Sequence, residues 1–563
     1  MGLSYSDAVE QATAAGSTWE LTNLEVDGVV HRAFRNAPPT LRDLFDSTRS
    51  RGDATFLVYE DERWGFDRFM SEVDAVAALL VDRYDVAHGD RVAIAMRNYP
   101  EWIVAFAAIT SIGAVSVSFN AWWTADEMTF ALEDSSAMLL VADAERVERS
   151  VDVCAALRVR VLGVRLGVDA APEGVDRWEE VVRPGAAMPP MVVDPEDLVT
   201  ILYTSGTTGR PKGAVSTHRA VMQALMGFGC RAAVQRLRSP STYNPGRATV
   251  FILIVPLFHV TGAVPVMLSC AASGLELVMM YKWDAARALE LIDRERVTNF
   301  VGVPTQSWDL LECDRFDEYD TSSLVSIGGG GAPAPPELVR RVASSFRGGS
   351  PSIGYGMTET NAYGPQNTGP DYLEHPTSTG RATPILAIDI RDEAGSSLPV
   401  GESGEIWFSG PNLISGYWNR PDATAETIVD GWLRTGDIGR VDGEGFVYVE
   451  DRAKDMVLRG GENVFCAEVE AAIYEHPSVY EAAVFGVPHQ RLGEEVAVVI
   501  VVRAGCVLDV GELQAHVTDR LASFKVPTLV VLRDDPIPRN ASGKMMKREL
   551  RDSLGGSDLS GSA

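Results

Sequence analysis

The chain of 563 residues has little of what builds a metal cluster or a disulfide scaffold. It contains six cysteines and eight histidines, and no two cysteines stand in a CxxC spacing. The cysteines are scattered, at Cys154, Cys230, Cys270, Cys313, Cys466 and Cys506. This spacing gives no support for a structural zinc site or a disulfide framework, and it fits a protein kept in the reducing cytoplasm.

Basic residues are also scarce. The 50 Lys and Arg residues are outnumbered by 78 Asp and Glu residues, which leaves a formal net charge of −28. An acidic surplus of this size argues against a general nucleic-acid binder and against docking on anionic lipid. It does not oppose the binding of a nucleotide, because a local cluster of amides and cations affects a bound phosphate more strongly than the average charge of the distant surface does.

Long uninterrupted apolar runs are missing as well. The two richest stretches are Trp102–Phe119, which contains Gly113, and Thr249–Tyr281, which is broken by prolines and glycines and carries Glu276. A membrane-spanning helix needs about 20 consecutive, mostly apolar residues. The first residues are acidic and lack the basic and apolar regions of a signal peptide. We therefore expect a cytoplasmic protein with no transmembrane segment and no nucleic-acid partner.

The chain is too long for a single hydrophobic core, so at least two domains are expected. Strand-like segments such as Phe56–Tyr59 and Val92–Ala95 alternate with helical segments such as Asp67–Tyr84 and Pro100–Ile112. This alternation predicts parallel α/β architecture. Near residue 450 a charged link is followed by a compact β/α unit of about 100 residues, an ordinary size for a small domain.

The most distinctive stretch is Tyr203–Ala214, with the sequence YTSGTTGRPKGA. Its glycines allow positive φ and leave backbone N–H groups uncovered, its hydroxyls are spaced to converge on one anion, and Lys212 adds a mobile cation. The stretch therefore predicts a cradle for a polyphosphate. It differs from the usual P-loop because Gly213, in place of Ser or Thr, follows the lysine. A polar surface loop is the alternative, since Ser, Thr and Gly are ordinary loop residues.

Four further segments contain residues that suit a nucleotide site. Pro256–His259 ends a very apolar strand with a histidine, and Ile327–Pro333 ends another with a glycine run suited to a planar ring. Gly354–Thr360 supplies an aromatic ring, a hydroxyl and a carboxylate, and Trp432–Gly439 presents Asp437 in a tight turn. Ligands of open α/β sheets bind at the carboxyl ends of strands, so we expect these segments to meet.

Five segments, in order and spacing, resemble the adenylate-forming superfamily of acyl-CoA synthetases, nonribosomal peptide adenylation domains and beetle luciferases. They are Tyr203–Ala214, Gly354–Thr360, Trp432–Gly439, Asp451–Asn463 and Pro538–Lys544. The resemblance implies two half-reactions. A carboxylate and ATP give an acyl-adenylate and pyrophosphate, and a thiol then gives a thioester and AMP. The implied cofactors are ATP, Mg²⁺ and the co-substrate CoA, and the partner is a small-molecule carboxylic acid.

The resemblance also implies the architecture. It indicates an α/β fold with a large N-terminal domain (1–450) of parallel-sheet α/β subdomains plus a β-barrel-like region, and a small mobile α+β C-terminal domain (455–554). The hinge would lie at 451–454, with Lys454 in the hinge position, because an exposed charged link can absorb the φ/ψ change. Residues 1–50 lead into the main body, and the small polar residues of 555–563 predict a disordered tail. The oligomeric state, a homodimer among the options, stays open.

Each residue that matches a motif takes an implied role at the nucleotide. The β- and γ-phosphates of ATP would be bound by Thr204, Ser205, Gly206, Thr207, Thr208, Gly209 and Lys212. Adenosine and the α-phosphate would meet Gly331, Ala332, Pro333, Tyr355, Gly356 and Met357, with Tyr355 stacked on adenine. Asp437 would accept hydrogen bonds from the two ribose hydroxyls, and Arg452 would add a donor.

The implied catalytic residues are Thr358 at the α-phosphate, Glu359 as the Mg²⁺ ligand together with Thr204, His259 as a gate of the acyl pocket, and Lys544. Lys544 would bridge the attacking carboxylate and the α-phosphate, and its cation would stabilise the charge that builds in the transition state. After adenylation the small domain would rotate, withdraw Lys544 and bring Gly460, Gly461 and Glu462 to the thiol tunnel. One departure from the family pattern is Cys466, where many relatives have proline. We interpret it as a structural variation and not as a nucleophile.

Plainer interpretations exist for single residues. Tyr355 could be an ordinary core residue, Asp437 a turn former and Lys544 one more surface lysine. His259 could be a satisfied histidine at a strand end. Arg231–Arg247 is interpreted first as a solvated loop, with contact to a CoA phosphate or a partner as the alternative. The functional interpretation of the first three residues depends on finding all five motifs in order.

The sequence defines the substrate acid and the acceptor of the acyl group less tightly than the reaction. Pro256–Pro265 contains no acidic residue, which disfavours α-amino acids, and Trp122–Trp123 resembles the fatty-acyl synthetases. The expected pocket walls are His259, Val260, residues 301–305 and 328–330, and Met357. Their small side chains favour a medium- or long-chain fatty acid or a bulky hydrophobic acid. We therefore expect an AMP-forming acid–CoA ligase. The alternative is an acyl-AMP ligase that loads a separate carrier protein, and a luciferase-like activity has no specific support.

Overall fold

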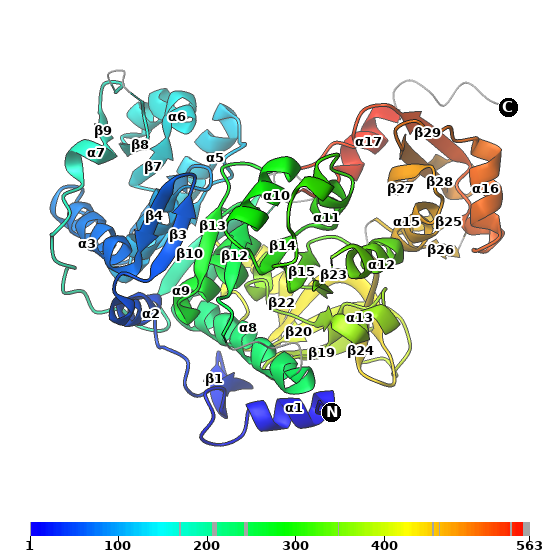
Figure 1. Cartoon of the computed structure of the whole chain (residues 1–563), viewed down its shortest axis with the longest axis horizontal. Helices are drawn as coiled ribbons and strands as arrows, with labels where there is room; N and C mark the ends of the chain where they lie inside the picture. Colours follow the sequence, from blue (N-terminus) through cyan, green and yellow to red (C-terminus); the bar gives the residue numbers. More distant parts are fainter. Residues whose placement is uncertain are drawn as a thin grey trace.

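The computed structural model describes residues 2–167, 171–204, 211–240, 246–346, 348–452, 455–460, 462–540 and 543–554. Two large sheets with their helices form the body of the molecule, and a smaller unit made of the C-terminal residues lies to one side (Figure 1). The expected α/β class is confirmed. Several residues of interest lie outside the described ranges, namely Ser205, Gly206, Thr207, Thr208, Gly209, Lys454, Gly461 and the tail 555–563.

The first sheet has eight strands and includes the hairpin that flanks the glycine-rich stretch. In spatial order the strands are β21 (Gly416–Tyr417), β11 (Lys212–Thr217), β10 (Leu198–Thr204), β6 (Val115–Ser118), β5 (Arg91–Ala95), β7 (Leu139–Asp143), β8 (Arg160–Val164) and β9 (Val175–Arg177). The strands from β10 to β9 run parallel, whereas β10 and β11 are antiparallel. The accompanying helices are α3 (Phe66–Asp82), α4 (Pro100–Ser111), α5 (Ala125–Ser135), α6 (Ala144–Leu157) and α7 (Trp178–Val181).

Helix α4 lies in the main core. All of its residues are buried, which suits its nearly continuous apolar sequence, because a helix that is apolar all round must be covered on every side. Pro100 stands at the first helical position, where its missing N–H costs nothing. The one carboxylate of the helix, Glu101, pairs with Arg165 at 3.0 Å, so its charge is not left alone in the interior.

The second sheet joins a parallel half to an antiparallel half. The parallel strands are β3 (Thr55–Tyr59), β13 (Glu276–Met279), β12 (Val250–Leu253), β14 (Asn299–Gly302), β15 (Ser326–Gly330) and β16 (Ser350–Gly354), with β4 (Glu62–Gly65) antiparallel at the edge beside β3. The antiparallel strands are β17 (Gln366–Thr368), β18 (Gly380–Arg381), β24 (Phe446–Arg452), β23 (Trp432–Val441), β20 (Gly404–Ser409), β19 (Ala387–Arg391) and β22 (Ile428–Val429). This antiparallel half corresponds to the β-barrel-like region expected from the sequence.

The helices associated with the second sheet alternate with its parallel strands or follow them. They are α8 (His218–Arg238), α9 (Ser269–Ser273), α10 (Ala285–Arg294), α11 (Pro304–Leu311), α12 (Pro336–Ser345), α13 (Gly369–Glu374) and α14 (Pro421–Thr427). The apolar stretch around residues 250–281 is a strand, a helical segment and a strand, as its prolines and glycines indicated. Among the described residues, none of the helices combines the length and the apolar character needed to cross a membrane.

The C-terminal unit has its own five-stranded sheet and its own core. Its elements are β25 (Val457–Arg459), β26 (Glu462–Val464), α15 (Cys466–Tyr474), β27 (Val479–His489), β28 (Gly493–Val502), α16 (Val510–Thr518), β29 (Leu529–Arg533) and α17 (Lys547–Leu554). Its two longest strands, β27 and β28, are rich in valine and alanine, and each has a buried middle stretch. Such β-branched and small residues suit a strand that is covered on both faces.

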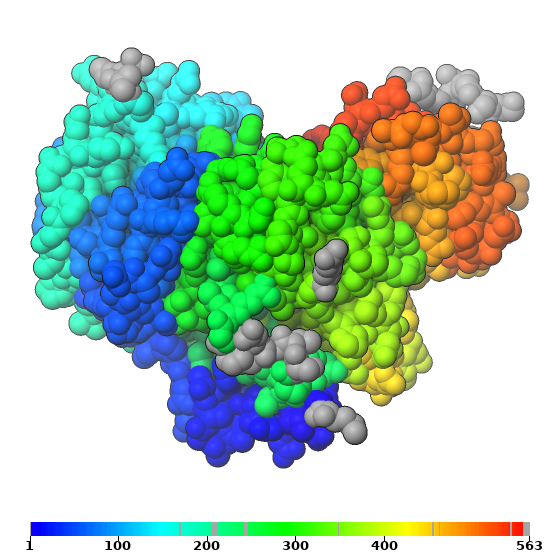
Figure 2. Space-filling model, viewed as in Figure 1, coloured from blue at the N-terminus to red at the C-terminus, as the bar shows by residue number. Residues whose placement is uncertain are grey.

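The N-terminal segment forms a separate bulge beneath α8 (Figures 1 and 2). The bulge contains α1 (Tyr5–Ala12) and the hairpin of β1 (Leu21–Val26) and β2 (Val29–Phe34), whereas the following α2 (Leu41–Thr48) packs on α4 and α9 of the main body. Helix α1 packs on α8, and the Leu3 N–H donates to Leu237 O at 3.2 Å. The interpretation of Arg231–Arg247 as a solvated loop is wrong for its first half, because α8 continues to Arg238 and carries Arg231 inward.

Candidate active site

The predicted motifs meet around one cavity of about 1960 Å³. The cavity lies where the hairpin β10–β11, the carboxyl ends of β14, β15 and β16, helix α8 and strand β23 converge. The predicted residues that line it are Thr204, Lys212, His259, Gly331, Gly356, Met357, Thr358, Glu359, Asp437, Arg452 and Lys544. Residues from seven separate segments are thus brought to one place, several of them at strand ends, where ligands of an α/β sheet bind.

Glu359 is buried in this cavity and is connected to Lys212 through Tyr417. Tyr417 Oη donates a 2.7 Å hydrogen bond to Glu359 Oε1, and Lys212 Nζ lies 5.0 Å from the centroid of the Tyr417 ring. Burial raises the pKa of Glu359, and the hydroxyl of Tyr417 opposes that rise. Motif reasoning missed Tyr417, whose strand β21 pairs with β11 one strand away from the predicted cradle.

The turn that carries Thr358 and Glu359 is braced by two buried asparagines. Asn361 Nδ2 donates to Asn412 O at 3.0 Å, and Asn412 Nδ2 donates to Thr360 O at 2.9 Å. Asn361 has a φ of 53°, a left-handed conformation that asparagine tolerates better than most residues. The backbone of the turn is therefore fixed by side-chain amides without help from a ligand.

Asp437 is held by Tyr355 on one side and by Arg452 on the other. Tyr355 Oη donates to Asp437 Oδ2 at 2.5 Å, and Arg452 Nε lies 3.2 Å from Asp437 Oδ1. Asp437 was expected in a tight turn, but it lies within β23, paired with Arg452 of β24. The neighbouring Gly436 has a φ of 70° and stands where the β20–β23 register shifts, so a bulge in the strand turns the carboxylate toward the cavity.

Bare backbone forms one wall of the cavity. β15 and β16 are parallel neighbours with Gly330 opposite Gly354, and a Cβ added to Gly330 would lie 3.2 Å from Gly354 O. The absence of side chains leaves room for a planar ring against the strands. Of the predicted ring-edge residues in the described chain, Gly331 lines the cavity and Ala332 and Pro333 do not. The Tyr355 ring is likewise outside the lining and reaches the site through its hydroxyl.

His259 lies at the carboxyl end of the β12 segment and faces the cavity. Its Nδ1 accepts a 3.3 Å hydrogen bond from the Thr261 N–H, and burial lowers its pKa to about 4. A histidine with this pKa is neutral at physiological pH and acts as a polar wall residue and not as a cation. Its expected role at the acyl pocket is compatible with this position.

Lys544 reaches the cavity from the C-terminal unit. Its loop is closed by reciprocal bonds, from the Lys544 N–H to Asn540 Oδ1 and from the Asn540 N–H to Lys544 O, both 2.9 Å long. Gly543 has a φ of 83°, and a Cβ there would lie 2.8 Å from Val303 Cγ2 of the large domain. The loop therefore fits against the end of β14 only because residue 543 has no side chain.

The remaining predicted residues of the C-terminal unit lie elsewhere. Gly460 and Glu462 belong to the turn and strand after β25 and do not line the cavity. Cys466 is fully buried, its N–H donates to Asp451 Oδ2 at 2.5 Å, and burial raises the pKa of its thiol. A buried thiol with a raised pKa is a poor nucleophile, in keeping with the structural role expected for it.

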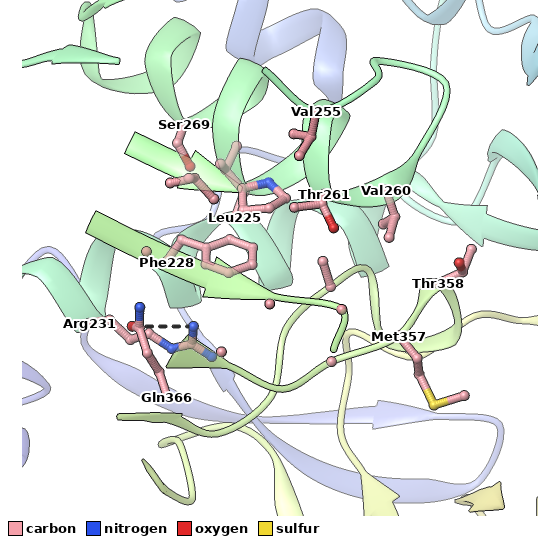
Figure 3. A pocket seen from close by; sticks show the side chains of 18 of the residues that line it. Leu225, Phe228, Arg231, Val255, Val260, Thr261, Ser269, Met357, Thr358 and Gln366 are labelled. Carbon is pink, nitrogen blue, oxygen red and sulfur yellow. Dashed lines mark hydrogen bonds between the residues drawn. The ribbon is translucent and has the colours of Figure 1, made fainter. Parts of the chain in front are cut away.

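A branch of the cavity extends from Met357 and Thr358 toward Arg231 and Gln366 (Figure 3). Apolar or small side chains form the walls between these two ends, including Leu225, Phe228, Val255, Val260, Thr261 and Ser269. No residue labelled in Figure 3 is acidic. Of the expected walls, Val301, Gly302, Val303 and 328–330 line the cavity, while Pro304 and Thr305 do not. Arg231 at the far end was not foreseen.

Within the described ranges, no group of three or more His, Cys, Asp or Glu side chains is arranged to hold a metal ion. Glu359 is the buried carboxylate beside the hairpin, and Thr204 lines the same cavity. One or two protein oxygens supplemented by substrate phosphates is the arrangement that Mg²⁺ commonly accepts. The donor set therefore fits a metal that arrives with a nucleotide and does not fit a permanent metal centre.

Comparisons with known proteins show the family of the chain. A family model described as AMP-binding enzyme matches residues 44–418, and one described as AMP-binding enzyme C-terminal domain matches residues 468–544. A feruloyl-CoA synthase from an Amycolatopsis species is 37% identical over 473 residues, which are 84% of this chain and 90% of that protein.

Two further proteins are similar to this chain over almost the whole of their own length. The 3-[(3aS,4S,7aS)-7a-methyl-1,5-dioxo-octahydro-1H-inden-4-yl]propanoyl:CoA ligase of Mycobacterium tuberculosis is 35% identical over 532 residues, 92% of this chain and 99% of that protein. The structure of o-succinylbenzoate CoA synthetase from Bacillus subtilis, in complex with its acyl-adenylate intermediate, has a TM-score of 0.76 at 27% identity and covers 90% of this chain and 98% of its own. The chain belongs to the AMP-binding enzyme family, among the acid–thiol ligases that form AMP.

Proposed function

We propose that the chain is an ATP-dependent carboxylic acid–CoA ligase that acts on a bulky hydrophobic acid. The observation that carries the proposal is the branch of the cavity between Thr358 and Arg231, which is walled by apolar and small side chains (Figure 3). None of the side chains labelled along this branch in Figure 3 is a carboxylate that could hold a substrate ammonium, which disfavours amino acids. The named substrates of the relatives, a feruloyl group and a bicyclic propanoyl group, are also bulky acids.

In the first half-reaction, a carboxylate oxygen of the acid forms a bond to the α-phosphorus of ATP, and the bond to pyrophosphate breaks. Thr358 and Lys544 would contact the α-phosphate, and Lys212 with the backbone beside it would receive the β- and γ-phosphates. The lysine cation is worth most where negative charge builds up in the transition state. Glu359 and Thr204 would hold Mg²⁺, which neutralises the charge on the leaving pyrophosphate when bound.

In the second half-reaction, the CoA thiolate attacks the acyl carbon and AMP leaves. Gly460, Gly461 and Glu462 lie away from the cavity or outside the described residues, so their role requires the C-terminal unit to rotate about residues 451–454. The polar contacts between the two units are compatible with such a rotation. They include Tyr480 Oη to Asp309 Oδ1 at 3.2 Å and Arg503 Nη1 to Glu312 Oε1 at 2.6 Å, which are interactions that water can replace.

The test is mass-spectrometric detection of acyl-CoA from ATP, Mg²⁺, CoA and a panel of acids. The panel spans short, medium and long fatty acids, aryl acids and ring-bearing propanoic acids. We expect thioester formation with the bulky members and little with acetate. Formation of an adenylate that hydroxylamine traps, without thioester, would overturn the assignment of CoA as acceptor and favour a carrier protein. Preference for acetate would overturn the assignment of the acid.

A further inference from the structure

Arg231 places a guanidinium group at the end of the acyl branch that is remote from the reacting carboxylate (Figure 3). Its Nη2 donates to Gly364 O, and its Nη1 lies at 3.5 Å from Gln366 Oε1, a long contact. The guanidinium carbon lies 4.5 Å from the centroid of the Tyr363 ring and 5.2 Å from that of Phe228. The charged group thus lies beside two rings that pack edge to face against each other, and it contacts two neutral oxygens.

No carboxylate neutralises this guanidinium among the described residues. Arg231 takes part in no ion pair within 4.0 Å, and its Nε is buried without a hydrogen-bond partner. Burial lowers its pKa, with partial compensation from nearby tyrosine hydroxyls. A partly buried charge without a counter-charge costs free energy, and such a group in a cavity is a candidate for contact with a ligand that supplies the missing partner.

The next arginine on the same helical face, Arg238, differs from Arg231 in its charge partner. Arg238 follows Arg231 by seven residues, two helical turns, and pairs with Asp371 Oδ1 at 2.9 Å. Arg381 pairs with the other oxygen of Asp371 at 2.7 Å. An acid is therefore supplied for Arg238 and Arg381, which also line the cavity, whereas no carboxylate of the described residues lies within ion-pair distance of Arg231.

A structural role alone explains Arg231 poorly. Holding Gly364 O requires one donor, which an uncharged side chain could provide without the cost of a buried charge. The weak contact to Gln366, whose side chain is exposed, leaves donor capacity on Nη1 for a group inside the branch. The Gln366 amide lies beside it and can turn to donate to the same group.

We propose that Arg231 is a specificity-determining residue that selects acids with an acceptor oxygen at the end remote from the activated carboxyl group. This inference depends on the proposed function, because the remote end is defined by the position of the adenylation site. The acceptor can be anionic, as in a second carboxylate, or neutral, as in a ketone or hydroxyl. Both accept hydrogen bonds from a guanidinium, and a carboxylate can do so in bidentate fashion.

The test compares acids that differ only in the remote oxygen. Unsubstituted fatty acids of increasing length are paired with their ω-hydroxy and α,ω-dicarboxylic counterparts, and a ring-bearing propanoic acid is paired with its keto derivative. Because Arg231 is fixed, we expect kcat/KM to favour the oxygenated acid by about tenfold to a hundredfold in at least one pair, the size of a hydrogen bond to a charged group. The hydroxy and dicarboxylic series then distinguish a neutral acceptor from an anionic one.

Arg231→Met should reduce that preference at least tenfold, and Arg231→Lys should retain part of it for the dicarboxylic acid. A merely structural role would lower kcat/KM equally for both members of a pair and leave their ratio unchanged, which would overturn the proposal. Equal kcat/KM values within every pair for the wild-type enzyme would overturn it as well. Arg340→Met, an exposed arginine on α12 that pairs with Glu337, is the matched control.

A binding measurement distinguishes failure of this inference from failure of the proposed function. Binding of each acid pair is measured by the shift in melting temperature at saturating ATP analogue, which needs neither thioester formation nor turnover. A larger shift with the oxygenated acid, lost in Arg231→Met, supports the role of Arg231 even if CoA is not the acceptor. If no oxygenated acid stabilises the wild-type protein more than its parent acid, and no pair differs in turnover, the inference is wrong.

Discussion

The Tyr355 hydroxyl donates a 2.5 Å hydrogen bond to Asp437 Oδ2 and so connects the end of β16 to the bulge in β23. Burial and the negative charge of Asp437 raise the pKa of Tyr355 well above its ordinary value, so the hydroxyl stays protonated and remains a donor. The carboxylate that is expected to meet the ribose is therefore oriented before ATP arrives. Pre-orientation of this kind lowers the entropic cost of binding.

Replacing Tyr355 by Phe keeps the ring and removes the donor. We expect the KM for ATP to rise by about fivefold to tenfold, the net value of a typical intramolecular hydrogen bond, because the lost bond orients Asp437 and does not itself touch the nucleotide; kcat should change less. Steady-state pyrophosphate release measures both constants. Tyr372→Phe is the control, since Tyr372 is buried away from the cavity and its hydroxyl has no hydrogen-bond partner in the described chain. An unchanged KM for ATP would show that Asp437 needs no such orientation.

Lys544→Ala removes the cation that the C-terminal unit brings to the cavity. We expect adenylate formation to fall by at least about a hundredfold, the cost of losing one electrostatic contact to a transition state. Thioester formation from supplied acyl-adenylate should be largely retained, because this step is expected in the rotated arrangement. Each half-reaction is measured alone, with the exposed Lys282→Ala as control. Equal loss of both half-reactions would contradict the role assigned to Lys544.

The fold class and most of the site could be predicted because strand ends gather at one edge of a sheet, wherever the strands stand in the sequence. Thr204 at the end of β10 and Thr358 after β16 reached the cavity for that reason, whereas Asp437 lies within β23 and Lys544 enters from a loop of the C-terminal unit. Tyr417 could not be predicted, because its contact with Glu359 depends on β21 pairing with β11 across about 200 residues.

The position of Arg231 was misjudged for a related reason. Gly227 and Gly229 precede it, and glycines inside a helical pattern argue against a helix. In the structure a Cβ on Gly227 would lie 2.3 Å from the Tyr363 ring, and one on Gly229 would lie 3.2 Å from Trp19 Nε1. Close packing from distant segments thus requires small residues in α8 and outweighs their low helix propensity, a condition that the local sequence does not reveal.

Glu312 connects the two units by accepting bonds from Arg341 of the large domain and Arg503 of the C-terminal unit, at 2.5 Å and 2.6 Å. Glu312→Gln weakens this bridge by removing the charge. Because a partly exposed ion pair contributes at most about 1 kcal/mol, we expect adenylation to slow by no more than about fivefold. Thioester formation from supplied acyl-adenylate should be unchanged or faster. The control is Glu318→Gln, since Glu318 pairs with Arg315 of its own domain. A parallel decrease of both half-reactions in Glu312→Gln would argue against a bridge between the units.

The loss of folding stability at acid pH should depend on the titration of His218, at the start of α8. The side chain is fully buried, its Nδ1 accepts a 3.0 Å hydrogen bond from the Leu41 N–H, and burial lowers its pKa to about 4, against a weaker opposing effect of Asp197 and Asp43. Between about pH 6.5 and pH 4 the unfolded chain binds a proton that the folded chain does not, so stability must fall as the pH falls through this window.

His218→Gln keeps an acceptor for Leu41 and removes the titration. We expect the variant to have a lower melting temperature than the wild type at pH 8, where the native histidine is neutral and well packed, but a smaller decrease between pH 7 and pH 5. His259, whose pKa burial also lowers to about 4, retains part of the slope in this variant, so His218→Gln/His259→Gln should be flatter still. His489→Gln, an exposed histidine of β27, serves as control. Identical slopes for the wild type and the double variant would show that the folded protein binds protons on both histidines as readily as the unfolded chain, and would contradict the lowered pKa values.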